Sequence, residues 1–338
     1  MLGIDSRAAR SAWTAALVVL ALWLVYLVRS TLYIFVLAVL FAYLLAPLVN
    51  LLDRLLPTRA TRTLALALAY VLLVGLVVVG AVVLGTKVVE QANKLASVFP
   101  QKIQGWVDSF QARLPDGLKN EVAVRSNDLF AALPQFGQKF LKLASNLIYV
   151  VIIPVLAFFF LKDGAATRDQ ILGLVEAGPR HKLLNDILAD INLLLAHYMR
   201  ALVLLSAVAF TAYSIFFSVL GIPFAILLAA LGAMLEFIPT LGPLTASAII
   251  LLVAAVTGGH LLAIVIFIVG FRMFQDYLVS PNLMGQGVEL HPLLVLFGVF
   301  AGAEVAGVPG AFLSVPVLAL ARALYLRMRH TRVPRAAP

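Results

Sequence analysis

The sequence predicts an all-α polytopic membrane protein with about eight spans, and three observations support this fold class. Hydrophobic residues make up 63% of the 338 residues and charged residues only 12%, whereas soluble globular chains have roughly 45–50% and about 25%. A soluble chain of this length could not bury so much apolar surface, because its interior is limited by its volume. Apolar stretches long enough to cross a hydrocarbon core of about 30 Å recur along the chain. This composition excludes most classes of soluble enzyme.

Cysteine content and net charge limit the chemistry and the binding partners of the protein. The chain has no cysteine, which excludes disulfides, thiolate catalysis and Cys-ligated metal centres. Its net charge is +9, and in membrane proteins an excess of Lys and Arg usually lies in cytoplasmic loops, where it meets anionic lipid. We therefore expect the lipid bilayer as a partner and no nucleic acid.

The first predicted domain, residues 1–86, contains three membrane spans. They are Ala12–Val28, Thr31–Val49 and Thr63–Thr86. The second apolar stretch follows the first at once and no small-residue cleavage site with a polar continuation appears, so the first span reads as an uncleaved anchor and not as a signal peptide.

The second predicted domain, residues 87–145, is amphipathic and forms an extramembrane helical arm. Its second half places Leu129, Leu133, Phe136 and Phe140 at alternating spacings of four and three, which is the a/d pattern of a helix packing along a partner helix. Pro115–Gly117 separates the two halves as a turn. Either the two helices cover each other, or the arm serves oligomerisation or partner binding.

The third predicted domain, residues 146–338, is the transport core. It holds the spans Asn146–Leu161, Ala201–Leu220 and Leu261–Val279, together with an amphipathic cytoplasmic helix at 182–199. Two further apolar segments are broken by Gly and Pro and predict helical hairpins. These are Ile222–Thr257, bent at Pro239–Pro243, and Leu293–Ala321, bent at Gly307–Pro309.

Each hairpin crosses twice or enters and returns on one side, so the number of spans is even and both termini share a side. Lys and Arg of the short connecting segments lie mostly on the side of the N-terminus. The positive-inside rule therefore predicts cytoplasmic termini.

Motifs for enzyme chemistry are missing from the sequence. Gly80–Lys87 comes near a phosphate-binding loop, but its last two residues are in the wrong order and it ends an apolar helix. The sequence contains no His-Glu-x-x-His or Gly-x-Ser-x-Gly motif, and its five histidines have no ligand spacing. We expect no enzyme activity, no cofactor and no metal site.

Few charged residues occur in the C-terminal apolar region, and such residues in lipid usually face a cavity or each other. Glu236 stands one turn before the break at Pro239, Gly242 and Pro243, and a helix broken inside the membrane is a common feature of transporter sites. The alternative is an interfacial glutamate at a helix end. Between Ala201 and Ala321 the charged residues are Glu236, Arg272, Asp276, Glu289 and Glu304.

Two more groups complete the candidate site for a solute or an ion. Arg272 and Asp276 share a helix face, so they form an internal ion pair, or else Gln275 and Asp276 mark a helix end. The loop at 281–287 is a second wall of the site or an ordinary polar turn. Its residues and flanks are Pro281, Asn282, Gly285, Glu289 and His291, while Gly298 and Gly302 form a GxxxG pair typical of helix packing.

Seven short motifs occur in order along the chain: Phe41–Asp53, Phe158–Gly164, Phe237–Pro243, Ser280–Gly285, Val288–Pro292, Gly307–Gly310 and Val315–Pro316. Together they resemble the motifs of the AI-2E (autoinducer-2 exporter) family of bacterial membrane proteins, and the resemblance runs from about Ala12 to Ala321. Thr240 departs from the family, which frequently has an aromatic residue there, and Gln275–Asp276 departs from its usual order.

The resemblance implies a protein of the bacterial inner membrane that exports a small polar signal, autoinducer-2, in quorum sensing. It also implies homo-oligomers, pentamers among them. Three hypotheses follow: a secondary or facilitated exporter of a small hydrophilic solute, an Na⁺(Li⁺)/H⁺ antiporter built on the same residues, and an envelope scaffold whose arm recruits other proteins.

Overall fold

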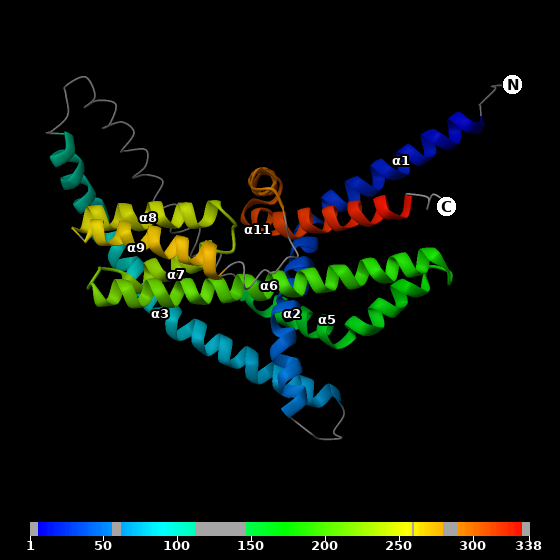
Figure 1. Ribbon diagram of the computed structural model, residues 1–338, viewed down its shortest axis with the longest axis horizontal. Coiled ribbons are helices and arrows are strands. Elements are labelled where there is room, and N and C mark those ends of the chain that lie inside the picture. The colour runs from blue at the N-terminus through cyan, green and yellow to red at the C-terminus, as the bar shows by residue number, and fades with distance from the viewer. Residues whose placement is uncertain (1–5, 56–61, 112–146, 259, 280–289, 333–338) are drawn as a thin grey trace, which may run out of the picture.

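The computed structural model describes residues 6–55, 62–111, 147–258, 260–279 and 290–332. Every regular element within these ranges is a helix, which confirms the all-α class (Figure 1). The elements are α1 (Ser6–Leu27), α2 (Arg29–Leu55), α3 (Arg62–Gln111), α5 (Leu147–Gly173), α6 (Pro179–Val219), α7 (Ala225–Leu235), α8 (Leu241–Thr257), α9 (Leu261–Phe274), the π-helix η1 (Gln275–Val279) and α11 (Pro292–Arg332).

Five of these helices, among the residues that the structure describes, are long and apolar enough to cross a membrane: α1, α2, α6, α9 with η1, and α11. The helices α7 and α8 are apolar but shorter, with 11 and 17 residues. The predicted spans Thr63–Thr86 and Asn146–Leu161 fall in α3 and α5. The chain is thus a multi-pass membrane protein, and the total of about eight spans stays a prediction.

Two helices run on where the sequence analysis placed a boundary. Helix α3 continues without interruption through Thr86 to Gln111. Helix α6 joins the predicted cytoplasmic helix at 182–199 and the span Ala201–Leu220 into 41 residues, or about 60 Å. No glycine or proline lies between residues 180 and 220 to end it. The seam residues Leu129, Leu133, Phe136 and Phe140 lie outside the described ranges.

Helix α6 is the common support of two apolar cores. Its C-terminal half packs with α7, α8 and α9, and Phe99 and Ile103 of α3 are buried in the same core. Its middle packs against α2 and α11 through Tyr198, Leu202 and Phe312. Figure 1 shows α7, α8 and α9 stacked along one end of α6, with the hairpin of α5 and α6 at the other end.

Both predicted Gly/Pro breaks are present. The chain leaves helical geometry between α7 and α8. Helix α11 bends back on itself at Ala306 and Gly307, where Gly307 has φ 63° and ψ −145°, a conformation that favours glycine. A methyl group on Gly302 would overlap the Gly310 carbonyl, and one on Gly298 would overlap Leu318. The GxxxG pair therefore packs the two halves of α11 together.

Candidate functional site

The break between α7 and α8 is built by residues that cannot continue a helix. Pro239 has no N–H to donate. Thr240 follows with φ 65° and ψ −57°, and the Leu241 N–H binds the Pro239 carbonyl at 2.7 Å, which is the geometry of a γ-turn. Gly242 then passes so close to Leu235 that a methyl group there would overlap the Leu235 carbonyl. Only glycine allows this approach of backbone to backbone.

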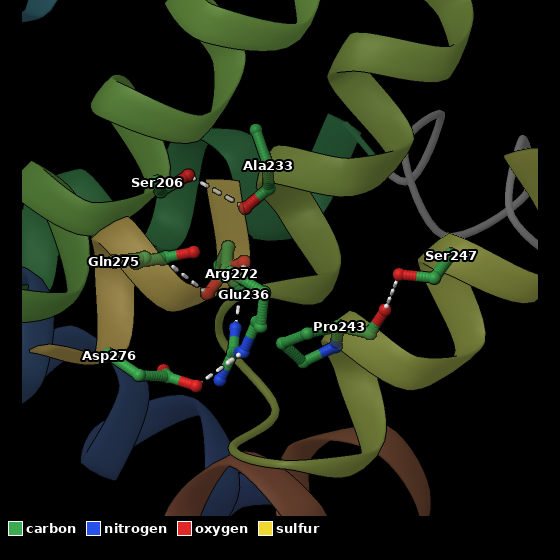
Figure 2. Close-up of polar contacts among 8 residues, drawn as sticks. All are labelled: Ser206, Ala233, Glu236, Pro243, Ser247, Arg272, Gln275 and Asp276. Atoms are coloured by element: carbon green, nitrogen blue, oxygen red, sulfur yellow. Dashed lines mark hydrogen bonds and ion pairs between the residues drawn. The ribbon is translucent and has the colours of Figure 1, made fainter. Parts of the chain in front are cut away.

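The carbonyl groups at the end of α7 all have partners. A break inside a membrane helix can leave carbonyl groups free to bind a solute, but here the chain itself satisfies these four. Ser206 of α6 supplies one of the donors from its hydroxyl (Figure 2). The four pairs are Glu236 N–H to Gly232, Ser206 Oγ to Ala233 at 2.7 Å, Phe237 N–H to Met234 and Ile238 N–H to Leu235.

The side chain of Glu236 is the buried charge that the sequence placed before the break. Glu236 is 7% exposed, and its Oε2 accepts a hydrogen bond of 3.0 Å from Nε2 of Gln275, which is 1% exposed. A guanidinium nitrogen of Arg272 lies 3.6 Å from its Oε1. A buried carboxylate needs such partners, because an isolated one is very costly in a low-dielectric interior.

Arg272 joins Glu236 to a second carboxylate. Its Nε donates to Asp276 at 3.0 Å, and Figure 2 shows Arg272 reaching both acids from α9. The predicted ion pair four residues apart is thus present. Asp276 and Arg272 are partly exposed, with 45% and 38% of their side chains accessible.

A π-helical turn presents the second half of this cluster. Gln275 and Asp276 are the first two residues of η1, which continues α9. Single π turns inside α-helices occur often at functional sites. The turn places Gln275 inward, beside Glu236, while Asp276 stays at the partly exposed edge. Nothing in the sequence signals a π turn.

The cluster Glu236–Arg272–Gln275–Asp276 combines two acids with one guanidinium. Arg272 can neutralise one carboxylate, which leaves the other to bind a proton or a cation. Oε1 of Gln275 is buried and makes no hydrogen bond to any residue that the structure describes. The buried Nη1 of Arg272 is the nitrogen that lies 3.6 Å from Glu236 Oε1, so it is held in that ion pair. A hydrogen-bond acceptor is therefore available beside the acids, as a hydroxyl-bearing solute requires.

Other predicted site residues lie elsewhere. Pro281, Asn282, Gly285 and Glu289 fall outside the described ranges. His291 is exposed, and its Nδ1 accepts a hydrogen bond of 3.3 Å from the Leu293 N–H at the start of α11. It acts there as a helix cap, and among the described residues its hydrogen bond is with α11 and not with the cluster.

Two contacts near the cluster were missed by the sequence analysis. One is the Ser206 bond to Ala233, which no motif marks. The other is the contact of Phe237, next to Glu236, with Phe312 of α11, at 5.9 Å between ring centroids. Because Phe237 belongs to the core shared by α2, α6 and α11, it joins the break to that core.

Comparisons with known proteins agree with this picture. The family model described as AI-2E family transporter matches residues 15–330. YueF of Bacillus subtilis is 25% identical over 307 residues, covering 85% of this chain and 81% of its own length. YrrI of Bacillus subtilis is 28% identical over 181 residues, 52% of this chain and 51% of its own length. A Methanothermobacter thermautotrophicus protein is 30% identical over 173 residues, 49% of this chain and 50% of its own length.

The chain spans about half the length of YrrI and of the Methanothermobacter protein, and most of YueF. All three relatives carry provisional names as transport proteins.

Proposed function

Because the chain belongs to the AI-2E transporter family, we propose that it carries a small hydrophilic solute across the bacterial inner membrane, by secondary or facilitated transport and with both termini in the cytoplasm. The observation that supports this most directly is Glu236, buried at a break between two short apolar helices and held by Gln275 and Arg272. Buried ionisable groups beside interrupted helices are typical of solute and ion pathways.

The solute would pass beside the end of α7, between the α7–α8 hairpin and α9. Gln275 would bind a hydroxyl group of the solute through its Oε1, which makes no hydrogen bond to the described chain. Arg272 would donate from Nη1, the nitrogen of its ion pair with Glu236, and Glu236 would accept a proton or a further hydroxyl. Autoinducer-2, the signal in the family's name, is the first solute to test.

The test is flux through the purified protein in proteoliposomes. We expect Glu236→Gln to lower the flux of autoinducer-2 by about tenfold or more, because a hydrogen-bonded charge is lost from the site. Glu304→Gln removes an acid from an exposed position on α11 and is the matched control. Wild-type flux in the Glu236 variant, with normal size-exclusion behaviour, refutes the assigned role.

A second candidate is exchange of Na⁺ or Li⁺ for protons. The cluster favours this candidate because it has two carboxylates, Glu236 and Asp276, and one guanidinium, Arg272. One carboxylate can therefore alternate between a proton and a metal ion. Proteoliposomes loaded with a pH dye and given a sodium gradient test this candidate. Proton flux that depends on sodium and is lost in Glu236→Gln supports antiport, whereas solute flux without any sodium response argues against it.

A further inference from the structure

Helix α7, which ends at the Glu236 site, has no cap of its own at its start. Its preceding residue, Phe224, has the left-handed conformation with φ 63° and offers no side-chain acceptor. The first N–H groups of any helix lack partners inside that helix. In the low-dielectric surroundings of a membrane protein, an unpaired N–H is costly.

A side chain from a distant helix supplies the missing acceptor. Oε1 of Gln91, on α3, accepts a hydrogen bond of 2.9 Å from the Leu227 N–H, across 136 residues of sequence. Leu227 is the third residue of α7, a position at which N-cap side chains normally bind.

The face of α3 that carries Gln91 is docked on the core around α7. Leu95, Phe99 and Ile103 follow Gln91 at steps of four residues and so lie on nearly the same face. Phe99 and Ile103 are buried in the core of α6, α7, α8 and α9, and Leu95 packs against it. The opposite side is exposed, as in the ion pair of Glu90 with Lys94 at 2.6 Å.

We propose that Gln91 is a positioning residue: it caps α7 from α3 and, through α7, sets the place of Glu236. About two and a half turns of helix separate the capped Leu227 from Glu236, and Ser206 binds the far end of α7. A helix of 11 residues moves as a rigid unit, so a displacement at Leu227 also displaces the break at its other end. The α3 segment Lys87–Gln111 then supports the site from outside it. Only the expected effect of Gln91 on flux rests on the proposed function; the capping of α7 does not.

Hydrogen–deuterium exchange on the full chain in nanodiscs tests the cap without any transport measurement. Gln91→Met keeps the size of the side chain and removes the acceptor, whereas Gln91→Glu keeps an acceptor next to the positive end of the helix dipole. Gln101→Met makes the same change at an exposed position of α3 and is the control.

We expect Gln91→Met to raise amide exchange about tenfold at the start of α7 and at residues 236–241, with α11 unchanged. Gln91→Glu and Gln101→Met should remain near the wild-type rates. Exchange that is unchanged in Gln91→Met overturns the cap, and faster exchange confined to the start of α7 overturns the coupling to Glu236.

Flux separates this proposal from the proposed function. Loss of flux in Gln91→Met, together with its rescue in Gln91→Glu, supports a positioning role. If Glu236→Gln transports normally, the proposed function fails, and the exchange pattern still decides whether Gln91 positions the break.

Discussion

Glu236 is held by partners that lie far from it in the sequence. Gln275 is 39 residues away, and its amide and the Arg272 guanidinium together provide the hydrogen bond and the charge that a buried carboxylate needs. The residue type and its place before a break could be predicted. The partners depend on how α9 packs beside α7, which no local pattern determines.

Removing the amide of Gln275 should weaken the site without removing a charge. We expect Gln275→Leu to raise the solute concentration needed for half-maximal flux about tenfold, because Glu236 loses a hydrogen bond to a charged group. The concentration dependence of flux in proteoliposomes measures this. Gln104→Leu, at an exposed position of α3, should behave as wild type, and an unchanged half-saturation in Gln275→Leu would show that the amide does not act on the site.

Gly242 should be the least tolerant glycine of the break. A methyl group there overlaps the Leu235 carbonyl, so Gly242→Ala must push α8 away from α7 and should lower the free energy of unfolding by about 1–3 kcal/mol. Thermal unfolding in detergent, followed by size exclusion, measures the loss. Gly270→Ala in α9 meets no atom within 4 Å and should not destabilise; equal melting of the two variants contradicts the close approach.

At the scale of elements, the positions of Gly and Pro predicted both hairpin breaks, because these residues interrupt helices through their own backbone properties. The continuity of α6 was not predictable in the same way. Its amphipathic first half and apolar second half differ in composition, and a change of composition does not end a helix when no breaker lies between them. No local pattern in the sequence predicted the π turn of η1 or the Gln91 cap, whose two partners are 136 residues apart.

The N-terminal half of α6 and the C-terminal half of α11 are joined by charges. Arg327 binds Asp186 at 2.8 Å and Asp190 at 2.7 Å, two acids that are one turn apart on α6. Arg327→Asp should therefore lower the thermal midpoint by a few degrees, and adding Asp190→Arg should recover part of the loss.

Salt provides an internal check on this ion pair. The difference between wild type and Arg327→Asp should shrink at high ionic strength, because exposed charges are screened. Arg180→Asp, at the exposed start of α6, is the matched control. If Arg327→Asp lowers the thermal midpoint equally at low and high salt, and Asp190→Arg does not restore it, these charges do not join α6 to α11.

At the scale of the molecule, the depth of the site in the membrane can be estimated from its position along α6. Ala233 is level with Ser206, which lies 13 residues, or about 20 Å, from the end of α6 at Val219. For a hydrocarbon core of about 30 Å that starts near Val219, the cluster lies inside the membrane and nearer its predicted cytoplasmic side.

The absence of cysteine makes the orientation easy to test, since single cysteines can be introduced into the natural chain. We expect Leu174→Cys, in the exposed turn between α5 and α6, to react only with reagent on the cytoplasmic side. Pro223→Cys and His260→Cys should react only from outside, whether the α7–α8 hairpin re-enters or crosses twice. Labelling of Leu174→Cys from outside would show that the predicted orientation of the chain is wrong.

The central claim is that Glu236, at the break between α7 and α8, carries the transported species. The most direct measurement is autoinducer-2 flux in proteoliposomes containing wild type, Glu236→Gln or Glu304→Gln at equal protein density. The account predicts flux through the wild type and the Glu304 variant, and a loss of about tenfold or more in the Glu236 variant. Equal flux through all three proteins would contradict it.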